Sequence, residues 1–183
     1  MWRLSAILLL LVAAPPPLAA QSNTFGVGRP PTADEIRNLK TAIAPDGTGL
    51  PEGSGNAVAG QEIFAMQCAR CHGNKAQGDV GPALWGGKGT LATARPVKTV
   101  GSFWPYATTL WDYINRAMPF DKPGLLKPSE VYAVSAFILT INGIINENDV
   151  MDAKTLPKVR MPNRDGFVAD PRPDVGEKAK KPN

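Results

Sequence analysis

The two cysteines and the one histidine of this 183-residue chain stand together in the segment Cys68-Ala69-Arg70-Cys71-His72. A Cys-x-x-Cys-His sequence is the attachment signature of a c-type haem. At the end of a helix, two thiols three positions apart can both reach the vinyl groups of one porphyrin and form thioether bonds. The histidine that follows can then offer an imidazole nitrogen to the iron. The segment predicts one covalently bound haem c, with Cys68 and Cys71 as attachment points and His72 as the proximal ligand.

Three other uses of this segment are weaker interpretations. A structural zinc site needs four ligands, and the chain supplies two cysteines and a single histidine. A thioredoxin-like dithiol favours a strand before the cysteines and a parallel sheet around them. The flanks here are helical on one side and rich in glycine on the other. A plain disulfide would leave His72 without a role, so haem attachment explains the segment best.

The distal ligand of the iron must be another residue type, because the chain has no second histidine. The candidates are methionine, lysine, tyrosine, water or no ligand at all, and a methionine thioether raises the reduction potential of the iron. Met118 ends a predicted helix, and Pro119 forces the chain to turn there. Met161 is the second candidate, Met151 lacks a following proline, and Met66 lies too close to the cysteines. We expect Met118 to be the distal ligand, with packing in the core as the alternative role.

The sequence predicts four helices that position these residues, each with a capping signal at its start or a breaker at its end. They run from Thr32 to about Ala44, from Ala57 to Cys68 after the cap Asn56, from Tyr106 to Met118, and from Pro128 to Asn142. Residues 73–103 are rich in glycine and predict an ordered loop. No alternating strand pattern occurs, so we expect an all-α fold.

The two ends of the chain differ in composition from its centre. Residues 1–20 have the parts of a secretory signal peptide, and we expect cleavage after Ala20 and a periplasmic product. A membrane anchor is the weaker interpretation, because three prolines interrupt an apolar stretch shorter than a span requires; no later segment is long enough to span a bilayer. The net charge of +4 comes without a long basic cluster, so nucleic acid is not an expected partner. Residues 168–183 are polar and rich in proline, and we expect them to be disordered.

These motifs together resemble a class I cytochrome c. The pair Gly60 and Phe64 before the Cys-x-x-Cys-His segment is similar to that family's first helix, where a small and an aromatic residue meet the last helix. Gly81-Pro82 is similar to its proximal loop, and residues 129–134 are similar to its final helix. The resemblance implies that the Pro82 carbonyl oxygen accepts a hydrogen bond from His72, which fixes the ring and raises its basicity as a ligand.

The resemblance also implies a domain organisation. It covers about residues 56–145, which we take as a cytochrome c domain of the class I fold with extended loops. Residues 21–55 then form an N-terminal extension and residues 146–167 a C-terminal extension, followed by the Pro-rich tail. We expect residues 148–167 either to wrap the domain or to dock on a partner subunit.

A narrower resemblance joins the chain to the cytochrome subunits of bacterial sulfite and sulfane dehydrogenases. It rests on residues 45–55, on Phe103–Ile114 and on Leu156–Phe167. In that family the cytochrome accepts electrons from a molybdenum-cofactor subunit and passes them to a soluble cytochrome or a terminal oxidase. Many members carry two haem domains, whereas this sequence has one Cys-x-x-Cys-His segment. The resemblance implies an electron-accepting subunit with no catalysis of its own.

Two other functions stay open at this point. A free-standing periplasmic electron shuttle would use the same chemistry with a different partner, and a haem peroxidase or gas sensor would need an open coordination position on the iron. Around the haem we expect a wall of five aromatic residues, of which Trp104 or Tyr106 could alternatively bind a propionate: Trp85, Trp104, Tyr106, Trp111 and Tyr113. Three cations are candidates to neutralise the propionates: Arg95, Lys98 and Arg116.

Overall fold

The structure is a computed structural model that describes residues 27–38 and 42–170. The expected signal peptide and most of the expected disordered tail lie outside the described residues. Within the described ranges, no helix has the length and apolar character needed to cross a membrane. The chain divides into two units, residues 1–40 and residues 41–183, which are described separately below.

The first unit contains helix α1, Ala33–Asn38. Its start follows the predicted capping pattern, because the Glu35 amide donates to the Thr32 hydroxyl and the Thr32 amide donates to the Glu35 carboxylate, at 3.2 and 2.7 Å. The prediction that this helix continues to about Ala44 is wrong, because residues 42–44 are not helical. Ala44 precedes Pro45, whose ring disfavours helical backbone at the preceding residue.

The second unit is mostly helical, as expected. Its elements, in chain order, are β1 (Ser54–Gly55), α2 (Ala57–Gln67), α3 (Ala69–His72), α4 (Ala107–Ala117), α5 (Pro128–Ile141), β2 (Met151–Asp152) and the 3-10 helix η1 (Leu156–Lys158). The three helices predicted for this unit are confirmed to within about a residue at each end. The short α3 is additional, since Cys68, with φ −119° and ψ −35°, is the C-cap of α2 and the N-cap of a new helical turn. That turn carries Cys71 and His72.

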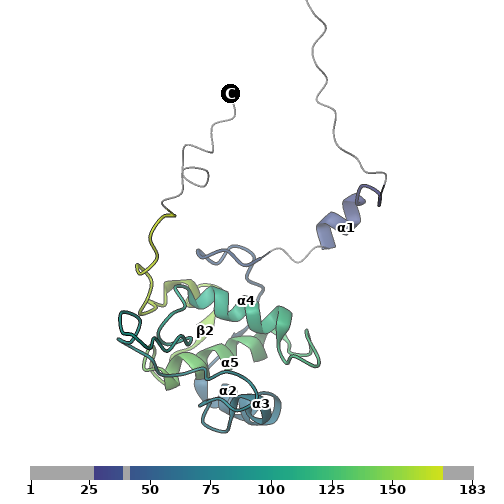
Figure 1. The fold of residues 1–183 in the computed structure, drawn as a ribbon. Coiled ribbons are helices and arrows are strands. Elements are labelled where there is room, and N and C mark those ends of the chain that lie inside the picture. Colours follow the sequence, from purple (N-terminus) through teal and green to yellow (C-terminus); the bar gives the residue numbers. More distant parts are fainter. Residues whose placement is uncertain (1–26, 39–41, 171–183) are drawn as a thin grey trace, which may run out of the picture. The chain divides into compact units, whose positions relative to one another are not determined.

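Helix α5 lies between α2 and α4 and contacts both (Figure 1). Val131 to Ala136, Ile138 and Leu139 are all buried, so α5 is apolar on nearly every face, which is typical of a helix surrounded by protein. Its first turn is capped by the Glu130 carboxylate, which accepts a hydrogen bond of 2.7 Å from the Lys127 amide. α5 is therefore the central element of the unit.

Helix α2 meets α5 at a very close backbone crossing. A Cβ added at Gly60 would lie 1.9 Å from the carbonyl oxygen of Ala133, so only glycine allows this approach. One turn later, the rings of Phe64 and Phe137 pack with their centroids 5.1 Å apart. The expected meeting of Gly60 and Phe64 with the last helix is confirmed.

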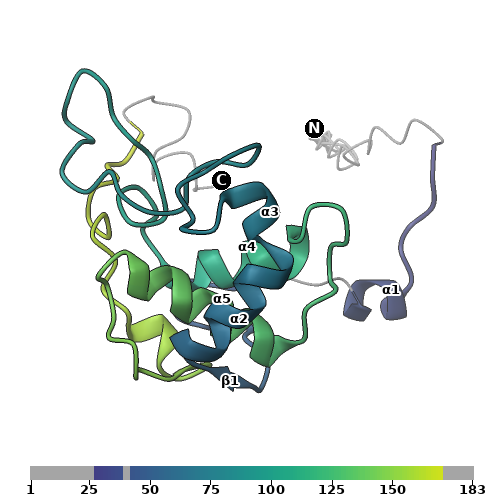
Figure 2. The same ribbon diagram turned by 90° about the horizontal axis from the view of Figure 1, so that it is seen from below.

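The segments on both sides of the helices pack into the same core. β1 and β2 form a two-stranded antiparallel sheet, in which Ser54 lies opposite Asp152, and β1 lies against α5 (Figure 2). Two-residue strands are too short to give an alternating pattern, so the sequence does not reveal them. After β2, the buried side chains of Leu156 and Met161 join the core. Residues 151–161 thus wrap the domain, as one of the two alternatives predicted, and docking on a partner subunit stays a prediction.

Candidate functional site

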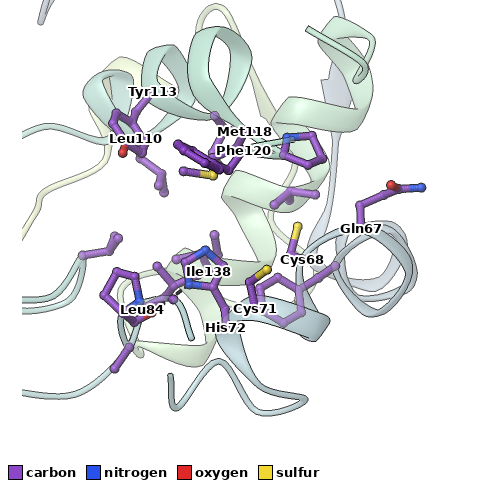
Figure 3. Close-up of a pocket in the computed structure, with 18 of the residues that line it drawn as sticks. Gln67, Cys68, Cys71, His72, Leu84, Leu110, Tyr113, Met118, Phe120 and Ile138 are labelled. Carbon is purple, nitrogen blue, oxygen red and sulfur yellow. Dashed lines mark hydrogen bonds between the residues drawn. The ribbon is translucent and has the colours of Figure 1, made fainter. Parts of the chain in front are cut away.

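The candidate site is a cavity of about 470 Å³ between α3 and the C-terminal half of α4. In Figure 3, His72 and Leu84 lie on one side of the cavity, and Met118 and Leu110 lie on the other. The sulfur atoms of both cysteines point into the cavity from one edge, and the sulfur of Met118 points into it from the wall that faces His72 (Figure 3). Apolar side chains form most of the remaining lining. The structure thus brings two thiols, an imidazole and a thioether to one apolar space.

The orientation of His72 is fixed by the loop that follows α3. Its Nδ1 lies 2.7 Å from the carbonyl oxygen of Pro82, as the resemblance implied. A carbonyl oxygen can only accept a hydrogen bond, so Nδ1 carries the proton and Nε2 keeps its lone pair for a metal. The loop is held in turn by a 2.8 Å hydrogen bond from the Gly81 amide to the Cys71 carbonyl oxygen. A Cβ at Gly81 would come within 3.1 Å of the imidazole Cε1, so glycine permits this close contact.

Among the methionines of the described residues, Met118 lines the cavity and three others do not. Met118 follows the last residue of α4, where its extended backbone ends the helix. Met161 and Met151 are 1% and 4% exposed and belong to the hydrophobic core, and Met66 is 69% exposed on α2. Met161, the second candidate for the distal ligand, therefore lies outside the cavity lining, because the segment that carries it packs as part of the core.

The two cysteines, which are all that the chain has, form no disulfide. Burial raises the pKa of the Cys68 thiol to about 11, with a smaller contribution from its electrostatic interaction with Cys71. Redox-active and nucleophilic cysteines have a lowered pKa, because the thiolate is the reactive form. A thiol–disulfide role is therefore not supported at this position, whereas thioether formation removes the ionisable group altogether.

Comparisons with known proteins agree with this geometry. Residues 57–142 match the cytochrome c family. A chain of the crystal structure of the sulfane dehydrogenase SoxCD from Paracoccus pantotrophus is 41% identical in sequence and superposes with a TM-score of 0.73. The match covers 87% of this chain and 80% of that chain. The chain belongs to the cytochrome c family.

Two curated relatives of this cytochrome share shorter regions. The thiosulfate dehydrogenase of Stutzerimonas stutzeri (strain A1501) is 30% identical over 135 residues, which cover 61% of this chain and 41% of the relative. A cytochrome c-553-like protein of Synechocystis sp. (strain ATCC 27184 / PCC 6803 / Kazusa) is 53% identical over 32 residues, 18% of this chain and 30% of the relative. The chain thus spans less than half the length of either relative. The expected cytochrome c fold is confirmed, and the protein is an electron carrier of that family.

The donor set of this cytochrome fits a haem c. Cys68 and Cys71 supply two thiols at one edge of an apolar cavity, and His72 presents a nitrogen whose partner nitrogen is already hydrogen-bonded. An imidazole and a thioether are both iron ligands in cytochromes c. By contrast, the described residues hold no group of three His, Cys, Asp or Glu side chains that could bind a bare metal ion. The zinc interpretation therefore finds no support in this part of the chain.

The expected aromatic wall is only partly present. Trp104 and Tyr113 line the cavity, and their rings meet edge to face with centroids 5.7 Å apart. The prediction is wrong for Trp85, Tyr106 and Trp111, which do not line it. Trp111 faces the core instead and packs on Tyr132 of α5.

Of the three cations considered for the propionates, Lys98 alone lines the cavity. Its ammonium nitrogen lies 5.1 Å from the centroid of the Phe103 ring. Arg116 forms an ion pair of 2.7 Å with Asp112, one turn earlier on α4, and neither it nor Arg95 contributes to the lining. The structure therefore favours Lys98 over the two arginines as a propionate neighbour.

One residue that supports the site was missed in the sequence. The side-chain amide of Asn142 donates to the carbonyl oxygens of Leu84 and Ile138, at 3.1 and 2.8 Å, and its oxygen accepts from the Gly86 amide at 3.1 Å. These bonds tie the loop that carries Pro82 to the end of α5. The Asn142-Gly143 pair in the sequence indicates the end of a helix. It does not indicate that the Asn142 side chain binds the proximal loop.

Proposed function

We propose that this cytochrome is a monohaem periplasmic protein that serves as the electron-accepting subunit of a molybdenum-dependent sulfite or sulfane dehydrogenase. The observation that carries the proposal is the similarity to a chain of the sulfane dehydrogenase SoxCD, 41% identical over 80% of that chain. The similarity to a thiosulfate dehydrogenase also supports the proposal that the electrons come from a sulfur compound. The amino-terminal 20 residues supply the signal peptide in this proposal.

The proposed attachment uses residues that already face the cavity. Cys68 and Cys71 would hold the haem through two thioether bonds, and Nε2 of His72 and the sulfur of Met118 would bind its iron. Pro82 acts through His72, because its carbonyl oxygen holds the proton on Nδ1 and makes the ring a stronger electron donor. When bound, the haem supplies a one-electron Fe(III)/Fe(II) couple.

The surrounding residues determine how that couple is used. With His72 and Met118 both holding the iron, no position would be left open for a substrate, and the bound haem would supply electron transfer. The apolar lining disfavours the additional positive charge of the oxidised state, and a thioether ligand acts in the same direction. Both effects raise the reduction potential, as suits an acceptor of electrons from sulfur-compound oxidation.

The haem and its ligands are tested on the protein expressed together with a cytochrome c maturation system. We expect a coloured product whose mass includes one haem and excludes residues 1–20, with the near-infrared band of a methionine–iron bond in the ferric state. A colourless product, or a Cys71→Ser variant with the same covalent haem content, would overturn the attachment. Ready binding of carbon monoxide to the ferrous wild-type protein would instead support a gas sensor or peroxidase.

The partner is tested separately, in the native host, by purifying the tagged protein and measuring its molybdenum content. We expect a stoichiometric complex with a molybdenum protein in the periplasmic fraction, in which sulfite or a sulfane compound reduces the haem. A haem protein that elutes alone, without molybdenum and without reduction by these compounds, would refute the subunit role and support a free-standing shuttle.

A further inference from the structure

The loop that follows Met118 is exposed over most of its length. Residues 120–125 are all exposed, and Phe120 is 84% accessible, whereas Pro119 and Leu126 at the two ends are buried. Within the loop, the Lys122 amide donates to the Pro119 carbonyl oxygen at 2.9 Å, which makes a tight turn directly after Met118. The side chains of this turn bury little apolar surface, so packing alone holds the turn weakly.

An ion pair connects this turn to the opposite wall of the cavity. Nη2 of Arg70 lies 2.7 Å from Oδ2 of Asp121, and both residues line the cavity. Arg70 stands between the two cysteines on α3, two residues before His72, and Asp121 stands three residues after Met118. The pair therefore links the chain segments that carry the two proposed iron ligands.

The electrostatic surroundings favour the charged form of both partners. The guanidinium of Arg70 is always charged in a protein, and the hydrogen bond from Arg70 is the main cause that lowers the pKa of Asp121. Their side chains are 63% and 45% exposed, so solvent and salt screen the attraction. An exposed pair contributes little to global stability, but it opposes any motion that separates the two segments.

We propose that Arg70 and Asp121 are positioning residues whose ion pair tethers the distal turn to α3 and limits how often the Met118 sulfur leaves the iron. The inference rests on the proposed haem ligation by Met118. Opening of the turn must carry Asp121 away from Arg70, because only two residues separate Asp121 from the methionine. The tether thus stabilises the state in which the Met118 sulfur binds the iron, and it has little effect on the rest of the fold.

The test is imidazole binding to the ferric holo-protein, followed by the visible spectrum. Imidazole competes with Met118 for the iron, so its apparent affinity reports the fraction of molecules in which the methionine has left. We expect Arg70→Gln and Asp121→Asn each to bind imidazole about two- to fivefold more tightly than wild type at low salt. The difference should shrink at high salt, because salt screens exposed charges.

Three further variants separate the tether from a general surface effect. The exchanged pair Arg70→Asp with Asp121→Arg should restore the wild-type affinity, and Arg70→Lys, which keeps the charge, should restore part of it. Asp165→Asn is the matched control, because it breaks the exposed ion pair with Arg160, and neither residue lines the cavity. This control should bind imidazole as wild type does.

Wild-type affinity in both single variants at low salt would overturn the tether, provided that the wild-type protein shows the near-infrared methionine–iron band. An equal gain in the Asp165→Asn control would overturn it as well. If the wild-type protein lacks that band and Met118→Ala leaves imidazole binding unchanged, the ligation proposed above fails, and the tether fails with it. The band therefore distinguishes failure of the tether alone from failure of the proposed function.

Discussion

Replacement of Asn142 by alanine tests how the proximal side of the site is held. The Asn142 amide makes three hydrogen bonds, to Leu84, Ile138 and Gly86, and thereby binds the proximal loop to α5. The backbone at Gly101 packs on the same amide so closely that an added Cβ would lie 1.9 Å from Oδ1. Alanine at this position removes the hydrogen bonds and leaves unfilled space beside residue 101.

The magnitude follows from these contacts. A hydrogen bond contributes about 1 kcal/mol net, and a buried group left without a partner costs more than that. Asn142 is partly exposed, so water can replace some of its bonds. We therefore expect Asn142→Ala to lower the free energy of unfolding by about 2 to 3 kcal/mol. Hydrogen exchange at the Gly86 amide should speed up more than exchange in α2, because the loss is local.

The assay is urea unfolding of the holo-protein, followed by circular dichroism, together with hydrogen exchange of the native state. Asn146→Ala is the matched control, since Asn146 is exposed and its side chain bonds to the Asp149 carboxylate in the next turn. We expect the control to change the free energy of unfolding by less than about 0.5 kcal/mol. Equal effects of the two variants would refute the idea that Asn142 holds the loop.

Three more predictions concern the helix crossing, the distal ligand and a buried phenol. Gly60→Ala should lower the free energy of unfolding by about 2 kcal/mol or more, and Ala133→Gly should not restore it in urea titrations, because the clash is with backbone. Met118→Ala should abolish the near-infrared band and admit carbon monoxide to the ferrous protein, whereas Met161→Leu, in the core, should change neither spectrum. Burial raises the pKa of Tyr132 to about 12, so between about pH 10 and 12 the unfolded chain loses this proton before the folded protein does. Stability should fall with rising pH over that range, and Tyr132→Phe should remove this part of the fall in urea unfolding.

The parts of the fold that depend on local signals could be predicted from the sequence. Asn56 caps α2 because its side-chain oxygen accepts a 3.1 Å hydrogen bond from the Ala59 amide, and Gly143, with φ +66°, follows the end of α5. The cavity residues nearest the haem motif could also be predicted, because the loop from Gly81 folds back on α3 within ten residues. Caps and turns of this kind depend on residues that are close in the sequence, so the spacing of a few residues predicts them.

The remaining features depend on contacts between distant segments. Leu110 and Trp111 are adjacent and both apolar, yet the first lines the cavity and the second packs in the core. A helical pattern separates apolar from polar faces, but it cannot separate two apolar surroundings from each other. Met151 and Met161 lie in a polar stretch rich in proline, and their burial depends on β1 and on the core surface that the helices build. No local pattern reports such a surface.

Helix α5 supplies no proposed ligand, yet every wall of the site depends on it. Val134 and Ile138 contribute to the cavity lining, Ala133 receives α2 at the glycine crossing, and Asn142 beyond its last turn holds the proximal loop. The helix α3, which carries His72, is held on α5 through α2 and the proximal loop, and Met118 is held on α5 through α4. The separation between His72 and Met118 is thus set by how these elements pack on α5. Relative displacement of these walls would require repacking of the α5 core, which is costly in a close-packed interior. The turn after Met118 does not pack on α5 in this way. An exposed ion pair between Arg70 and Asp121 can therefore influence how Met118 binds the iron, whereas it could not influence His72.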